Sequence, residues 1–143
     1  MLSSANSGSS SVGVTSKKLK PLLHMCASIG HEVPVWDSHD KFGDTALLVS
    51  DMAMGRDLAH VIGPLPTALM RGHGATMVGK SIQETVFRAV YSMDNAVVQM
   101  QAHALAAGGE VEFLSLEESE KSMGGRNVPR SWSLWKHQMT AGR

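Results

Sequence analysis

The sequence predicts a domain of the α/β class, because strand-like apolar runs alternate with helical patterns that carry clear end signals. Two apolar runs, 67–70 and 75–79, flank a turn of sequence Arg-Gly-His-Gly and have the composition of buried strands. A capped amphipathic pattern over 81–109 follows them, and a shorter one over 50–63 precedes them. We expect residues 18–143 to form one domain around this hairpin.

The elements before the hairpin are marked by proline and glycine. Pro21 and Gly30 predict the start and the end of a first helix. Pro34 places the extended run 32–36 away from the centre of a sheet, because proline donates no ladder hydrogen bond. The Asp-rich stretch 37–44 is expected to be a loop.

The helix over 50–63 has Ser50 or Asp51 as its cap and Gly63 at its end. Glycines also flank the hairpin that follows it, where the apolar run 67–70 enters the turn and the run 75–79 leaves it.

The helix over 81–109 is the clearest element. Ser81 and Glu84 have the spacing of a capping box, and a Gly-Gly pair ends the helix. Apolar residues at spacings of three and four predict one buried face. They are Ile82, Val86, Val90, Met93, Val97, Met100 and Ala104.

After this helix the patterns are shorter. Residues 110–114 read as an extended piece, and Ser115 with Glu118 predicts a short acidic helix. A last helix carries Trp132 and Trp135 three residues apart, on one face.

Composition excludes several classes of protein. The formal net charge of zero argues against a nucleic-acid binder that works by neutralising phosphates, and it favours association between copies. No apolar run is long enough to cross a membrane. The single cysteine, Cys26, lies in an apolar stretch and is expected to be buried, which suits the cytoplasm. Residues 1–17 are rich in Ser and Gly and predict a flexible lead.

His73 is the first candidate for chemistry. The glycines on both sides let the backbone approach closely and leave the imidazole accessible, as a metal ligand or an acid–base group requires. The alternative is a hairpin turn that happens to contain a histidine.

The other candidates have weaker patterns. The remaining histidines are His24, His31, His39, His60, His103 and His137, and none belongs to an H-x-H or HExxH motif. Asp37 and Asp40 flank one of them and could hold a hard cation, but their spacing matches no calcium loop. The acidic run Glu117, Glu118 and Glu120 complements a helix dipole.

A phosphate loop is a further alternative. Gly74, Gly79, Lys80 and Ser81 have the spacing of G-x-x-x-x-G-K-S. The four residues between the glycines are apolar and favour a strand over a loop, so the sequence argues against nucleotide binding.

The stretch 69–109, which holds the His-Gly hairpin and the long helix, resembles the class II aldolase/adducin family and, within it, the decarboxylase-like branch. Supporting pieces occur in the family's order, and the resemblance covers about 12–137. They are LKPLLHMCASIG, VPVWDSHDKFGDTALLVSD, MGRDLAHVIG, RGHG, VEFLSLEE and SWSLWK. The resemblance implies a three-layer α/β/α sandwich around a largely antiparallel sheet.

The resemblance also implies chemistry. Members of the family are metal-dependent lyases, either aldehyde-lyases or carboxy-lyases, that cleave a C–C bond in a small hydroxy- or oxo-acid through a metal-stabilised enolate. Three histidines hold the divalent metal, often zinc, and His73 matches the third of them. An upstream glutamate often serves as acid and base. Members commonly form homo-oligomers and act on small molecules, not on nucleic acids or membranes.

The sequence departs from this pattern at its start. The H-x-H pair would fall near Ser3 and Ala5, but the first histidine is His24. The catalytic residues are therefore not identified, and the domain reads as N-terminally truncated. Three alternatives follow: part of a lyase, a catalytically inactive adducin-like binding or assembly protein, or a chain completed by another polypeptide.

Overall fold

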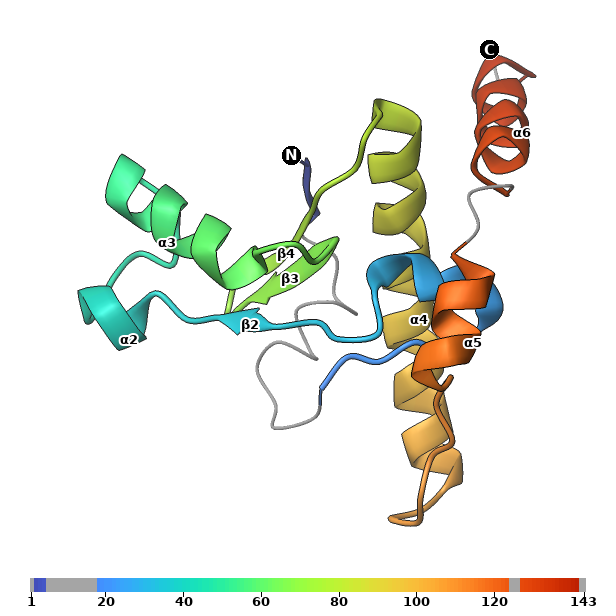
Figure 1. Cartoon of the computed structure of the whole chain (residues 1–143), viewed down its shortest axis with the longest axis horizontal. Coiled ribbons are helices and arrows are strands. Elements are labelled where there is room, and N and C mark those ends of the chain that lie inside the picture. Colours follow the sequence, from blue (N-terminus) through green and yellow to red (C-terminus); the bar gives the residue numbers. More distant parts are fainter. Residues whose placement is uncertain (1, 5–17, 124–126, 142–143) are drawn as a thin grey trace.

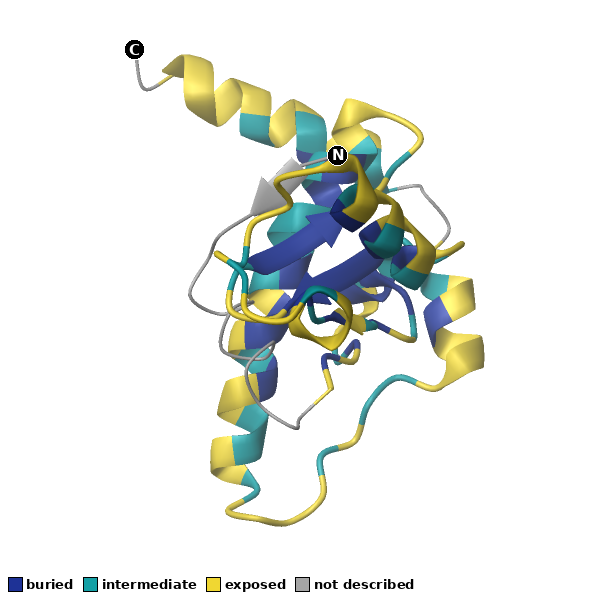
Figure 2. Ribbon diagram, turned by 90° about the vertical axis from the view of Figure 1, so that its left-hand side faces the viewer, coloured by how far each residue is buried: buried dark blue, intermediate teal, exposed yellow. Residues whose placement is uncertain are grey.

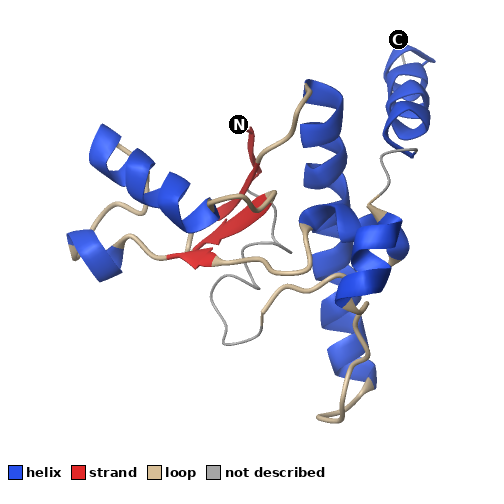
Figure 3. Ribbon diagram, in the orientation of Figure 1, coloured by secondary structure: helices blue, strands red, loops and turns tan. Residues whose placement is uncertain are grey.

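The chain folds around one small sheet with helices on either side, as a computed structural model describes for residues 2–4, 18–123 and 127–141 (Figures 1 and 3). The elements in order are β1 (Leu2–Ser4), the 3₁₀ helix η1 (His24–Ile29), β2 (Val35–Trp36), α2 (His39–Phe42), α3 (Met52–Ile62), β3 (Thr67–Met70), β4 (Gly74–Met77), α4 (Ile82–Leu105), α5 (Leu116–Ser122) and α6 (Asn127–Ala141).

The sheet is mixed, with the strand order β1-β4-β3-β2. The pairs β1–β4 and β3–β4 are antiparallel, whereas β2 runs parallel to β3. β2 lies at the edge, as Pro34 predicts. The α/β class is therefore confirmed. The sheet in the described residues is smaller and more mixed than the largely antiparallel, three-layer arrangement that the resemblance implies.

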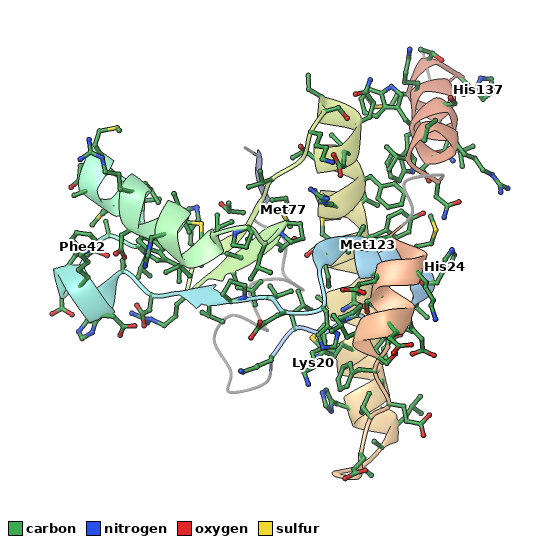
Figure 4. All side chains as sticks on the ribbon, viewed as in Figure 1. Lys20, His24, Phe42, Met77, Met123 and His137 are labelled. Carbon is green, nitrogen blue, oxygen red and sulfur yellow. The ribbon has the colours of Figure 1, made fainter. Side chains whose placement is uncertain are left out.

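Each face of the sheet has its own hydrophobic core, because side chains alternate between the faces along a strand. Leu69 and Met77 point to the face that packs on α4, where they meet Ala96 in one buried cluster. Figure 4 shows Met77 at this position, between the sheet and α4. Met70 points to the other face and joins Leu58 of α3 in a second cluster.

Two side-chain amides of α4 hold the segment 18–22 in an extended conformation. Gln99 accepts a hydrogen bond from the Lys20 amide (3.0 Å) and donates one to the Lys18 carbonyl (2.7 Å). Asn95 accepts from the Leu22 amide (2.9 Å) and donates to the Lys20 carbonyl (2.7 Å). The two amides act as the partner that a neighbouring strand would provide. We call this arrangement the amide clamp.

The amide clamp explains why the first predicted helix is wrong in extent. We expected a helix that starts near Pro21, but η1 begins only at His24 and is a 3₁₀ helix. Pro21 belongs to the clamped extended segment and is buried there. The predicted end is correct, because Gly30 follows η1 with a φ of 92°, which favours glycine.

The predicted apolar face of α4 is not its buried face. Ile82, Val97 and Met100 are exposed, Ile82 by as much as 71%, and Val86 is only half-buried. Figure 2 shows this long helix with one buried side and much exposed surface. Most residues that α4 buries are polar or small, and with Phe87 they are Thr85, Ser92, Asn95, Ala96 and Gln99. The clamp requires polar groups on the inner face, which periodicity of apolar residues does not detect.

The predicted helix ends are largely confirmed. Asp51 caps α3 by accepting from the Met54 amide (2.9 Å), and Ser81 caps α4 by accepting from the Glu84 amide (3.2 Å). Both halves of the predicted capping box are present at the start of α5. In contrast, the predicted loop 37–44 contains the short helix α2, and 110–114 pairs with no described strand.

Two sequence expectations concern Cys26 and the first residues. Cys26 is buried, as predicted, and burial, followed by the charge of Asp94, raises the pKa of its thiol to about 11. Within the predicted flexible lead, Leu2–Ser4 form β1, and the remainder lies outside the described residues. None of the helices in the described ranges has the length and the apolar composition to span a membrane.

The amide clamp yields a stability prediction. Asn95→Ala removes two part-buried hydrogen bonds and leaves the Leu22 amide and the Lys20 carbonyl without these partners, so the free energy of unfolding should fall by about 1–2 kcal/mol. Gln99→Ala should act similarly, and the double variant should lose less than the sum of the two, since both hold one segment. Urea unfolding measures these values. Gln101→Ala, an exposed amide on α4, is the control. Equal effects of Asn95→Ala and Gln101→Ala would contradict the clamp.

Candidate functional site

The candidate site lies at one edge of the sheet, where three strands begin or end together. β2 and β3 run parallel and pair Trp36 with Met70, so the residues after both strands meet at this edge. β4 starts there too, because Met70 pairs with Gly74 across the hairpin. Asp37, Arg71 and His73 all belong to the connections at this strand-end edge.

The turn that carries His73 requires its glycines. Gly72 has a φ of 69° and Gly74 a φ of 144°, which are conformations that residues with side chains rarely adopt. A Cβ on Gly72 would also lie 2.9 Å from Cδ1 of Leu47. The His73 amide donates to the Met70 carbonyl (3.0 Å) and closes the turn. The turn therefore places the half-buried imidazole of His73 beside the sheet.

An ion pair between Arg71 and Asp37 joins the two neighbouring strand ends. The Arg71 amide also donates to the Trp36 carbonyl (2.9 Å), and Asp37 accepts from the His39 amide (2.9 Å). Burial acts to raise the pKa of Asp37, but the hydrogen bonds from Arg71 and His39 outweigh it and lower that pKa. Asp37 thus positions Arg71 and is not part of a cation loop with Asp40.

A cavity of about 420 Å³ lies against His73 and opens to solvent. Its apolar wall comes from the 44–50 connection, α3 and β3, and consists of Leu48, Val49, Leu58 and Met70. Gly55 of α3 also lines the cavity, and because it has no side chain it contributes only backbone there. Thr76 is the second polar residue there, and its hydroxyl donates to the Met70 sulfur (3.4 Å). The site thus joins one imidazole to a largely apolar hollow.

The structure does not bring the other histidines to His73. Nε2 of His24 lies 3.5 Å from Asn127 of α6, and Nε2 of His39 lies 3.6 Å from Asp44. His103 packs near Phe113, with ring centroids 6.2 Å apart. His60 is on α3 and His137 on α6, both exposed, and His31 lines a separate hollow beside Lys18 and Lys20.

A metal ion does not fit the residues of this chain alone. Across the described ranges, no three His, Cys, Asp or Glu side chains come together in a group that could hold one. The remaining positions of the sequence contain none of these residue types. Catalytic zinc needs about three protein ligands, and this chain offers His73.

The expected place of the H-x-H pair can also be located. Ser3 lies in β1, which runs beside β4 and pairs Ser3 with Thr76 and Ser4 with Ala75. Ala5 lies outside the described residues. The strand in which the resemblance would place the first of the other two ligands therefore runs beside β4, and it has Ser3 where the resemblance would have a histidine.

Strand β4 excludes the phosphate-loop alternative. Gly74–Met77 form β4 and pair with both neighbours, so their amides belong to the sheet and cannot cradle a phosphate. The sequence did not identify Arg71 or the cavity residues. An arginine and an aspartate that each follow a predicted strand were the available signal for the ion pair.

Comparisons with known proteins found relatives that are named as decarboxylases. The decarboxylase tropJ of Talaromyces stipitatus is 33% identical over 150 residues, which cover 90% of this chain and 56% of that protein. A 3,4-dihydroxyphthalate decarboxylase of Terrabacter sp. is 33% identical over 72 residues, which cover 50% of this chain and 29% of the relative. This chain thus spans about half or less of the length of the relatives it matches.

A solved structure shares the fold. An aldolase II superfamily protein from Pseudomonas syringae superposes with a TM-score of 0.73 at 17% identity, over 99% of this chain and 56% of that one. Residues 6–100 match the family described as "Class II Aldolase and Adducin N-terminal domain". The chain therefore belongs to the class II aldolase and adducin family, and the decarboxylases among its relatives place it near the decarboxylase-like branch.

Proposed function

We propose that this chain forms the His73 side of a decarboxylase-like lyase that breaks a C–C bond in a small hydroxy- or oxo-acid. The observation that carries the proposal is the glycine-flanked turn that places His73 in the lining of a solvent-open cavity at the strand-end edge. Relatives named as 3,4-dihydroxyphthalate decarboxylases favour carboxy-lyase over aldehyde-lyase chemistry. The chain is proposed to work in the cytoplasm.

A divalent metal, zinc in the first instance, belongs to the proposal only with help from a second polypeptide. His73 supplies one ligand. The neighbouring strand β1 has Ser3 where the resemblance would have a histidine, so it supplies no second one there. The others would come from another copy or from the remaining portion of the family fold, since the relatives are about twice as long. That portion would also complete the proposed three-layer, largely antiparallel sandwich.

Zinc binding tests the role of His73. Zinc titrated into the chain should shift the imidazole NMR signals of His73 before those of the other histidines. His73→Ala should weaken the tightest zinc binding at least about tenfold, which corresponds to 1.4 kcal/mol. His137→Ala, which removes an exposed histidine of α6, is the matched control. Equal zinc affinity of the wild-type chain and His73→Ala would contradict a metal at this site.

Turnover tests the reaction class. Once a second polypeptide completes the site, the zinc-loaded wild-type protein should release CO₂ from 3,4-dihydroxyphthalate, His73→Ala should not, and His137→Ala should retain the wild-type rate. An aldol-cleavage assay with small hydroxy-acids, run in parallel, separates the two kinds of lyase. Full activity in the completed His73→Ala protein, or aldol cleavage by the completed wild-type protein with no CO₂ release, would refute the proposed carboxy-lyase.

A second candidate function is adducin-like assembly, with another copy of this chain as the partner. One surface favours it: a hollow of about 680 Å³ between α4 and α6, lined by Val86, Val90, Trp132, Trp135 and Met139 among others. Met139 is 72% exposed beside it. The zero net charge adds no repulsion between copies. An apolar surface of this kind is typical of an interaction site.

Sedimentation velocity checks the assembly. The wild-type chain should sediment as an oligomer at micromolar concentration, and Met139→Glu should shift it towards the monomer by placing a charge in the hollow. Leu105→Glu, at a position that is even more exposed and lies at the far end of α4, should leave the oligomer intact. A monomeric wild-type chain, or equal effects of both substitutions, would count against this surface.

A further inference from the structure

We propose that Gly55 determines substrate specificity. Because it has no side chain, it keeps open a subsite for a flat apolar group on the substrate of the His73 site. The inference rests on the proposed function, because it assigns the part of the substrate that lies away from the reacting carboxylate. It commits to an acid whose carboxylate end faces His73 and whose planar, aromatic-sized body lies against α3.

The first observation is that the fold gives no reason for a glycine at this position. Gly55 lies inside α3, and its amide donates a regular helical hydrogen bond to the Asp51 carbonyl (3.1 Å). Its φ is not in the left-handed region. A Cβ built there would meet only Cγ1 of Val49, at 3.9 Å, which is ordinary contact. Alanine would therefore fit, and it would make the helix more stable.

The second observation is the place of Gly55. It lines the same cavity as His73, and the apolar residues Leu48, Val49 and Leu58 lie around it. Any side chain at position 55 larger than a methyl group would project into this hollow. A residue that weakens its helix and at the same time leaves room beside a histidine is best explained by the ligand that uses the room.

The third observation is the chemistry of the lining. The cavity volume of about 420 Å³ lies in the range of small-molecule sites, and apolar side chains dominate its wall. His73 and Thr76 are the polar residues of the lining, and both come from the sheet side. A ligand therefore meets polar groups at the sheet and apolar groups at α3. This division fits an acid with a carboxylate at one end and an aromatic ring at the other.

The test measures binding and stability separately. Benzoate and acetate are titrated into the chain with ¹³C-labelled methyl groups, with no metal and no turnover. Benzoate should shift the methyl signals of Leu48, Val49 and Leu58, and acetate, which shares the carboxylate but lacks the ring, should bind at least about tenfold more weakly. Equal binding of the two acids, or benzoate shifts elsewhere only, would overturn the inference.

Two variants complete the test. Gly55→Ala should raise the melting temperature by roughly 2 to 5 °C, and Gly55→Leu should remove benzoate binding without lowering the melting temperature. Ala59→Leu adds the same bulk to an exposed position of α3 and should leave benzoate binding unchanged. If Gly55→Leu binds benzoate as the wild-type chain does, the inference is wrong. If Gly55→Ala instead lowers the melting temperature, the glycine serves the fold and the inference is also wrong.

The outcomes are separable from those of the proposed function. Benzoate binding that depends on Gly55 supports the proposed subsite even if no CO₂ release is found. Conversely, CO₂ release from 3,4-dihydroxyphthalate with a KM that Gly55→Leu does not change would support the proposed reaction and contradict the subsite at Gly55.

Discussion

The rest of the structure depends on the amide clamp between α4 and the segment 18–22. Asn95 and Gln99 satisfy four backbone groups of a segment that belongs to no described strand. The segment places the fully buried Leu19 in the core beneath the sheet and leads into η1. From η1 the chain enters β2, whose end delivers Asp37 to the strand-end edge. Helix α4, which is distant in the sequence, thus helps to position the segment that leads to Asp37 of the site.

The register of the strand pairs brings the residues of the site together. Parallel pairing of β2 with β3 sets Asp37 beside Arg71, and the antiparallel hairpin sets His73 one turn further on. The hairpin needs positive φ at Gly72, so a glycine precedes His73 in the turn. The edge therefore combines a histidine in a glycine-flanked turn, a paired arginine and an apolar cavity. This combination supports a site for a small acid more directly than any single residue does.

What the sequence predicted was mostly local. The hairpin around His73, the caps at Asp51 and Ser81 and the capping box of α5 depend on residues within a few positions, and all are confirmed. The extended segment 18–22 depends on partners 73 to 81 positions away, and the sequence wrongly predicts that a helix starts within it, near Pro21. The buried face of α4 was missed for the same reason, because its polar residues are buried to serve that distant segment. The Arg71–Asp37 pair likewise required the pairing of strands that the sequence does not specify.

We expect His73 to be a ligand at a site which a second polypeptide completes. X-ray diffraction at the zinc absorption edge, from crystals grown with zinc, would locate the metal. An anomalous peak should lie about 2.0–2.1 Å from a ring nitrogen of His73, the usual Zn–N distance, with further ligands from another chain in the crystal. Zinc bound only at other histidines, with no peak at His73 in crystals that hold zinc elsewhere, would contradict it.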